Sequence, residues 1–125
     1  MIFDTDVIVW YLRHHAGAIR LLDETADRCV SVVTYMELLQ GARDKREALS
    51  IRSFLTDFAF QMLPLTENVG HRASIYMEEY GPKSGMTMAD ALLAATAVEN
   101  RQTLCTANRK HYKFIRDLDL RIFRP

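Results

Sequence analysis

Three acidic residues that lie far apart in the sequence occupy similar places relative to the predicted strands and helices. Asp4 ends an apolar strand near the start of the chain. Glu37 follows Thr34 by three positions, in the first turn of a predicted helix. Asp90 follows Thr87 by three positions, in the first turn of another helix. Carboxylates held close together repel one another, and a hard divalent cation such as Mg²⁺ or Mn²⁺ relieves that repulsion. The pattern predicts a metal site if the fold gathers these residues.

Predicted strands and helices alternate along the 125-residue chain, whose length suits one domain, residues 1–125. The strands are predicted at residues 1–4, 29–33, 60–63, 103–106 and 120–123. The helices are predicted at residues 5–13, 16–26, 34–41, 46–58, 66–81, 87–101 and 108–115, with a loop at 81–86. This alternation is typical of parallel strands joined by right-handed crossovers. We expect an α/β fold: a three-layer α/β/α sandwich with a four- or five-stranded parallel sheet.

Such a fold brings the acidic residues to one edge of the sheet. Helices in parallel α/β proteins run opposite to the strands, so the first turn of a helix lies where strands end. Asp4, Glu37 and Asp90 therefore all reach the carboxyl edge of the sheet, where these folds bind their ligands.

Each acidic residue also has a purely structural interpretation. The segments "TYME" and "TMAD" match the capping box, in which a threonine and an acid three positions later satisfy the free amides of a helix start. Asp6 can favour the start of its helix through the helix dipole. Capping explains each residue singly, but the arrival of Asp4, Glu37 and Asp90 at one edge favours a metal site.

The charge is unevenly distributed, although sixteen basic and sixteen acidic residues give a net charge of zero. Residues 101–125 hold seven Lys and Arg against two Asp and Glu. This basic tail is either a solvated face or a surface for nucleic-acid phosphates. Because a bound Mg²⁺ can polarise a phosphoryl oxygen, a phosphodiester substrate fits both features. The candidate RNA-binding residues are Arg109, Lys110, Lys113, Arg121 and Arg124.

Four segments, "DTDVIVWYL", "SVVTYMELLQGA", "MADALLAATAV" and "LCTANRKHYKFI", occur in the order and at the spacing of a known family. Together they resemble the PIN-domain ribonucleases, in particular the VapC-type toxins of toxin–antitoxin pairs. The resemblance implies a metal-dependent endoribonuclease that uses Mg²⁺ or Mn²⁺ and cleaves RNA by water attack. It also implies a VapB-type antitoxin as partner and a homodimer.

By this resemblance the family's three acids fall on Asp4, Glu37 and Asp90, and Thr106 opens the fourth motif. Many members carry an aspartate two residues after that threonine, where this chain has Asn108. The implied catalytic residues are Asp4, Glu37, Asp90 and Asn108, with Asp4 and Asp90 as metal ligands. Asparagine offers an oxygen without charge, which leaves open whether one metal ion or two are bound.

Two other classes of protein share part of the pattern. A haloacid-dehalogenase-like phosphotransferase also begins with an apolar strand followed by D-x-D, but it would need Asp6 and would leave Glu37 and Asp90 without a role. A receiver-like signalling domain has a similar length and an acidic pocket. Its phosphoacceptor would end the third strand, whereas Asp57 precedes the predicted one.

Cys29 and Cys105 lie in predicted buried strands, and free buried thiols fit a reducing cytoplasm. In the family's strand order the first strand lies between them, so roughly 9.6 Å would separate their strands, too far for a disulfide.

No signal peptide is expected before Asp4, and no apolar stretch is long enough to span a membrane. Met36 and Met62 are predicted in the interior. The histidines have no zinc-site spacing and are predicted on the surface or on helix faces: His14, His15, His71 and His111.

Overall fold

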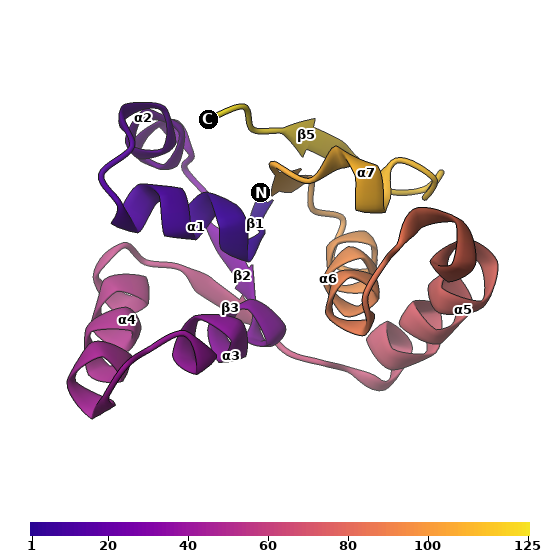
Figure 1. The fold of residues 1–125 in the computed structure, drawn as a ribbon, viewed down its shortest axis with the longest axis horizontal. Helices are drawn as coiled ribbons and strands as arrows, with labels where there is room; N and C mark the ends of the chain where they lie inside the picture. Colours follow the sequence, from indigo (N-terminus) through magenta and orange to yellow (C-terminus); the bar gives the residue numbers. More distant parts are fainter.

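The computed structural model describes residues 1–125 as alternating strands and helices (Figure 1). The strands are β1 (Ile2–Phe3), β2 (Cys29–Ser31), β3 (Gln61–Leu63), β4 (Leu104–Thr106) and β5 (Leu120–Ile122). The helices are α1 (Thr5–Leu12), α2 (Ala16–Glu24), α3 (Val32–Gln40), α4 (Lys45–Asp57), α5 (Glu67–Ser84), α6 (Met88–Glu99) and α7 (Arg109–Tyr112). No helix is both long and apolar enough to cross a membrane.

All five strands pair in parallel in the order β3-β2-β1-β4-β5. The central strand β1 pairs with β2 through Ile2 and Cys29, and with β4 through Ile2 and Leu104. The predicted α/β class with a parallel sheet is confirmed, at five strands. Because β1 separates β2 from β4, Cys29 and Cys105 remain free and buried, as predicted.

Neighbouring residues of each strand point into different cores, one on each face of the sheet. Ile2, Cys29 and Leu104 join a cluster with the buried faces of α5 and α6. Phe3 joins a second cluster with side chains of α1, α2 and α4. Figure 1 shows these two groups of helices on opposite sides of the strands. Burial on both faces explains why the inner strands β1, β2 and β4 are mostly apolar, while the edge strands β3 and β5 carry the exposed Gln61 and Arg121.

The second strand ends earlier than predicted, and the helix after it begins earlier. Ser31 caps α3 by accepting a 3.0 Å hydrogen bond from the amide of Val33, so Val32 and Val33 are helical. Thr34 is therefore not the cap: it is buried inside α3, and its hydroxyl has no hydrogen-bond partner. The capping box predicted for Thr34 and Glu37 is wrong, because a serine three residues upstream ends the strand first.

The predicted loop at 81–86 is also wrong for most of its length. Helix α5 continues through Gly81 and Pro82 and ends only at Ser84. Ser84 donates a 2.9 Å hydrogen bond to the Tyr80 carbonyl, and Gly85 stops the helix with a left-handed φ of 69°. Other predicted boundaries shift by smaller amounts, except that the last helix is only Arg109–Tyr112.

Two methionines predicted in the interior lie on the surface instead. Met36 on α3 is 50% exposed and Met62 on β3 is 41% exposed. His15, at the start of α2, is half-buried between Trp10 and Phe123. Its Nδ1 caps α2 by accepting from the amide of Ala18.

Candidate active site

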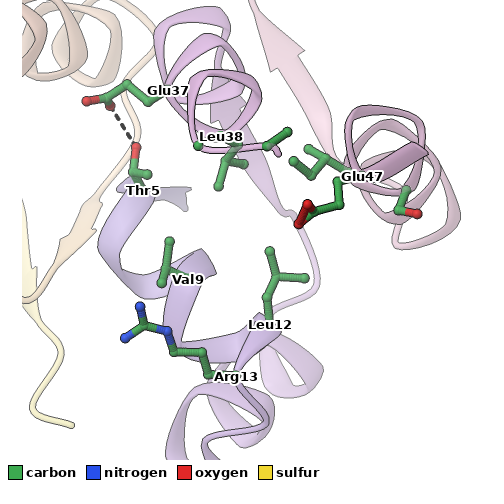
Figure 2. Close-up of a pocket in the computed structure, with 11 residues that line it drawn as sticks. Thr5, Val9, Leu12, Arg13, Glu37, Leu38 and Glu47 are labelled. Carbon is green, nitrogen blue, oxygen red and sulfur yellow. Dashed lines mark hydrogen bonds between the residues drawn. The ribbon is translucent and has the colours of Figure 1, made fainter. Parts of the chain in front are cut away.

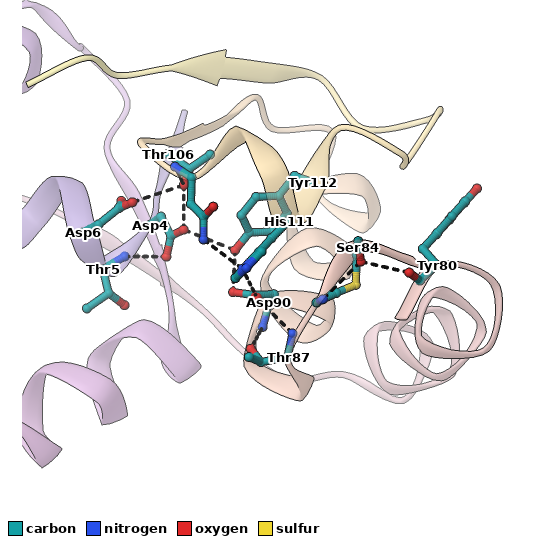
Figure 3. Close-up of polar contacts among 12 residues, drawn as sticks. Asp4, Thr5, Asp6, Tyr80, Ser84, Thr87, Asp90, Thr106, His111 and Tyr112 are labelled. Atoms are coloured by element: carbon teal, nitrogen blue, oxygen red, sulfur yellow. Dashed lines mark hydrogen bonds and ion pairs between the residues drawn. The ribbon is translucent and has the colours of Figure 1, made fainter. Parts of the chain in front are cut away.

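Asp4 stands at the carboxyl end of β1 and caps α1. Its Oδ1 accepts a 2.7 Å hydrogen bond from the amide of Thr5. Its Oδ2 accepts from the hydroxyl of Thr106 at the end of β4, at 2.8 Å, and from that of Tyr112 on α7, at 3.2 Å. Three segments therefore hold this carboxylate, which is only 9% exposed (Figure 3).

Asp90 reaches the same place from α6. It forms the predicted capping box with Thr87, whose amide donates to Asp90 Oδ2 at 3.0 Å. Its Oδ1 accepts a 3.0 Å hydrogen bond from the hydroxyl of Tyr112, and its Oδ2 lies 2.8 Å from His111 Nδ1. Capping and site formation are thus compatible in one residue. The structure brings Asp4 and Asp90 together at the sheet edge, with Tyr112 between them.

Asp6 does more than start a helix. Its Oδ2 accepts a 3.0 Å hydrogen bond from the amide of Ala107 and lies 3.4 Å from the hydroxyl of Thr106. Its Oδ1 is buried and has no hydrogen-bond partner. The interpretation of Asp6 as a helix-start residue alone is wrong, because its side chain faces the end of β4 beside Asp4 (Figure 3).

Glu37 stands apart from the bonds that join Asp4 to Asp90. It is exposed on α3, and its Oε1 accepts a 2.7 Å hydrogen bond from the hydroxyl of Thr5. It lines a cavity of about 550 Å³ between α1, α3 and α4 (Figure 2). The link from Glu37 to Asp4 runs through Thr5, the residue next to Asp4.

The amide of Asn108 donates a 3.0 Å hydrogen bond to Thr106 Oγ1, which bonds Asp4, and its side chain reaches Asp90 through His111. Its Nδ2 lies 2.8 Å from His111 Nδ1, which in turn contacts Asp90. His111 lies on helix α7 and is 26% exposed, and its contact with Asp90 within the site was not predicted. The role of Tyr112 in the site was not predicted either. The signal in the sequence was their position, because His111 and Tyr112 both belong to the short helix that directly follows the end of β4.

Comparisons with known proteins agree with the fold described above. The profile of the PIN domain family matches residues 1–116. The chain belongs to the PIN domain family. Membership excludes the phosphotransferase and receiver interpretations, whose folds differ from this one.

This PIN domain is similar to the Ribonuclease VapC1 of Methanocaldococcus jannaschii, with 24% identity over 98% of this chain and 86% of that protein. A chain of a toxin–antitoxin complex from Klebsiella pneumoniae has the same fold, with a TM-score of 0.79 and 24% identity over 94% of this chain and 93% of that one. A chain of VapBC2 from Rickettsia felis, bound to a DNA fragment from its promoter, gives a TM-score of 0.80 and 22% identity over 99% of this chain and 100% of that one.

Burial makes the acidic edge of this PIN domain electrostatically unfavourable. Burial first, and then the charge of Asp6, raise the pKa of Asp4 from 3.8 to about 7. Burial also raises the pKa of Asp6. Burial together with the charges of Asp4 and Asp90 raises the pKa of the Tyr112 phenol, so it is a neutral donor. Neither Asp4 nor Asp6 has a basic side chain as an ion-pair partner. The edge thus collects negative charge that a cation would neutralise.

The donor set of the PIN domain fits a hard metal ion. No three His, Cys, Asp or Glu side chains converge closely enough to hold a metal by themselves. Asp4 Oδ2 and Asp90 Oδ1 nevertheless face the same phenol oxygen, and Asp6 Oδ1 is an unpaired buried acceptor. Mg²⁺ is usually bound by one or two carboxylates and several waters, so this set of oxygens suits it.

Basic residues begin directly after the acidic edge. Arg109 and Lys110 open α7, which follows β4. The five candidate RNA-binding residues are all exposed, and none forms an ion pair within the chain: Arg109, Lys110, Lys113, Arg121 and Arg124. Arg20 of α2, which the sequence analysis did not select, joins Arg121 and Arg124 around a cavity of about 230 Å³.

Proposed function

We propose that this PIN domain is an Mg²⁺- or Mn²⁺-dependent endoribonuclease of the VapC type. The observation that carries the proposal is that Asp4 and Asp90, 86 positions apart in the sequence, both hydrogen-bond to the hydroxyl of the buried Tyr112. The name of the similar Methanocaldococcus jannaschii protein, a ribonuclease, supports the proposed activity.

Asp4 and Asp90 would hold the metal ion, with Asp6 beside them to orient the attacking water. The ion would supply polarisation of a phosphoryl oxygen and a more acidic water. Glu37 is exposed beside Thr5 and would accept a proton or orient that water from the substrate side. Asn108 would compete with Asp90 for His111 Nδ1, since one ring nitrogen makes only one of these two hydrogen bonds at a time. Attack by water leaves a 5′-phosphate and a 3′-hydroxyl.

The RNA would extend from the acidic edge over the basic residues. Arg109, Lys110 and Lys113 lie on or next to α7, on one side of the site. Arg121 and Arg124 lie on or just after β5, whose Ile122 is in register with Thr106. Exposed arginines and lysines without internal partners are free to bind phosphate oxygens, which supports this path.

We also propose that the protein is the toxin of a toxin–antitoxin pair, since similar solved chains come from such complexes. The antitoxin would place an Arg against the acidic residues, because a guanidinium can donate two parallel bonds to a carboxylate. The cavity between α1, α3 and α4 would receive its apolar side chains, as Val9, Leu12 and Ile51 line it beside Glu37.

Exposed Met36 and Met88 are candidates for a homodimer interface. Buried free thiols support a cytoplasmic location.

The decisive experiment measures cleavage of a labelled single-stranded RNA by the purified chain. Activity should require Mg²⁺ or Mn²⁺, stop with EDTA, and vanish in Asp90→Asn, a variant that keeps the size of the side chain. Mapping of the ends should find a 5′-phosphate. Cleavage that survives EDTA, or a 2′,3′-cyclic phosphate product, contradicts the proposal.

The toxin proposal needs a separate test. The chain should be poorly tolerated when expressed alone and well tolerated with the product of a small adjacent gene. That product should copurify with it and inhibit RNA cleavage. If cells tolerate the chain alone at high level and no neighbour binds it, the toxin proposal fails even where the nuclease stands.

A further inference from the structure

Tyr112 is the one side chain that contacts both Asp4 and Asp90. Its phenol oxygen lies 3.2 Å from Asp4 Oδ2 and 3.0 Å from Asp90 Oδ1. The residue is 1% exposed and belongs to the core cluster that packs α5 and α6 against the sheet. Because the ring is enclosed by the core, the place of its hydroxyl is set by the fold and not by the carboxylates.

The remaining bonds of the two carboxylates show what depends on this hydroxyl. Asp4 is held at both oxygens without it, by the amide of Thr5 and the hydroxyl of Thr106. Asp90 is held at Oδ2 only, by the amide of Thr87 and by His111. Asp90 Oδ1 has Tyr112 as its single partner. Tyr112 therefore decides where the second oxygen of Asp90 stands relative to Asp4.

A second buried tyrosine in this chain shows the ordinary way to satisfy such a hydroxyl. Tyr76 on α5 is 4% exposed, and its hydroxyl lies 3.0 and 3.2 Å from the two oxygens of a single carboxylate, that of Asp117. One acceptor group is enough to satisfy a buried phenol. Tyr112 instead stands between two carboxylates that come from β1 and α6 and repel one another. A packing role alone does not require that arrangement.

We propose that Tyr112 is a positioning residue whose hydroxyl holds Asp90 Oδ1 facing Asp4 Oδ2, so that one divalent cation can bind both. The inference rests on the proposed metal-dependent function and assigns a role that the acidic residues do not supply. The phenol has one O–H, shared between Asp4 Oδ2 and Asp90 Oδ1, and both oxygens stay turned toward it. Groups that orient a ligating carboxylate in this way commonly change metal affinity by 10- to 100-fold when they are removed.

The test compares Tyr112→Phe with Tyr76→Phe. Both changes remove one buried hydroxyl from a tyrosine bonded to aspartate, so they are matched in size, burial and chemistry. Mn²⁺ binding to the full chain is measured by calorimetry, with circular dichroism as the check on folding. We expect Tyr112→Phe to raise the Kd for Mn²⁺ about tenfold and Tyr76→Phe to leave it unchanged.

RNA cleavage by the same variants gives a second, independent measurement. The Mn²⁺ concentration for half-maximal cleavage should rise in Tyr112→Phe in step with the Kd. The rate at saturating Mn²⁺ should stay close to that of the unaltered protein, because the hydroxyl orients ligands and does not touch the reacting atoms. A loss of rate that saturating metal does not restore overturns the positioning role.

The unaltered chain offers a check that needs no substitution. Fluorotyrosine labelling followed by fluorine NMR should show the Tyr112 resonance moving as Mg²⁺ is added, while the Tyr76 resonance stays in place. An unmoved Tyr112 resonance at saturating Mg²⁺ contradicts the inference, even if Tyr112→Phe fails to fold.

The outcomes separate this inference from the proposed function. If the unaltered protein binds no Mn²⁺ and cleaves no RNA, both fail. Suppose instead that the unaltered protein binds Mn²⁺. If Tyr112→Phe then binds Mn²⁺ equally well, or if Tyr76→Phe weakens Mn²⁺ binding as much as Tyr112→Phe does, only the role of Tyr112 fails.

Discussion

Replacing Asp4 by asparagine should stabilise the metal-free protein while it destroys the proposed metal site. Asparagine has nearly the same shape and is as good a helix cap as aspartate. Its oxygen can accept from the amide of Thr5, and its NH₂ can donate to the hydroxyl oxygens of Thr106 and Tyr112, which surround Asp4 Oδ2. The substitution therefore removes a buried charge and leaves its neighbours with partners.

The size of the effect follows from the pKa of Asp4. Burial and the nearby charge of Asp6 raise the pKa of this carboxyl from 3.8 to about 7. Since each pKa unit corresponds to about 1.4 kcal/mol, ionising Asp4 in the folded protein costs up to about 4 kcal/mol more than in the unfolded chain. That is a large part of the stability of an ordinary domain.

The sign of the pH dependence is fixed by the direction of the shift. Between pH 3.8 and about 7 the unfolded chain releases a proton that the folded protein keeps. Folding is therefore favoured at the low end of this window, and the contribution of Asp4 to the free energy of unfolding falls as the pH rises through it. Asp4→Asn removes this loss, so its advantage should grow from nearly nothing at pH 4 to its full size at pH 8.

Urea denaturation in the presence of EDTA, at pH 4 and at pH 8, measures this difference directly. Mg²⁺ at 100 times its Kd should then narrow the difference at pH 8, because it adds about 2.7 kcal/mol to the protein that binds it and nothing to the variant. If Asp4→Asn is no more stable than the original at pH 8 without metal, the buried, uncompensated charge inferred for Asp4 is wrong.

Three further outcomes are expected. Asp6→Asn should fold and lower RNA cleavage about tenfold, since its side chain is bonded to Ala107 beside the site; full activity would return Asp6 to a helix-start role. Replacing Arg109 or Arg20 by glutamine should each reduce the slope of log affinity for single-stranded RNA against log salt by about 0.7, and an unchanged slope would make that residue ordinary surface. Cys105, whose thiol pKa burial raises to about 11, should resist alkylation until the protein is unfolded; rapid labelling of the folded protein would contradict its burial.

The place of the acidic residues could be predicted because it depends on topology. Once strands and helices alternate, Asp4 at a strand end and Asp90 in a first helical turn must reach the same edge, and the structure brings them together. The boundaries of the strands and helices were harder to predict. Val32 and Val33 favour a strand by residue type, yet the local bond from the amide of Val33 to Ser31 starts a helix there.

The supporting residues of the site could not be predicted in the same way. Helix α7 has four residues, too few for a periodic pattern to show which face meets the sheet. His111 and Tyr112 therefore looked like part of a basic tail, although both contact Asp90. The course of α5 through Pro82 could not be predicted either, because Gly81 and Pro82 are residue types that usually end a helix.

The central position of β1 also orders events during synthesis of the chain. Asp4 leaves the ribosome long before its partners Thr106 and Tyr112, which lie 102 and 108 positions later. Strand β1 cannot gain its neighbour β4 until residues 104–106 have been translated, and contacts of such long range close slowly. A chain that stops before β4 thus carries Asp4 without the rest of the site. Synthesis of the proposed nuclease is in this way separated in time from assembly of its active site.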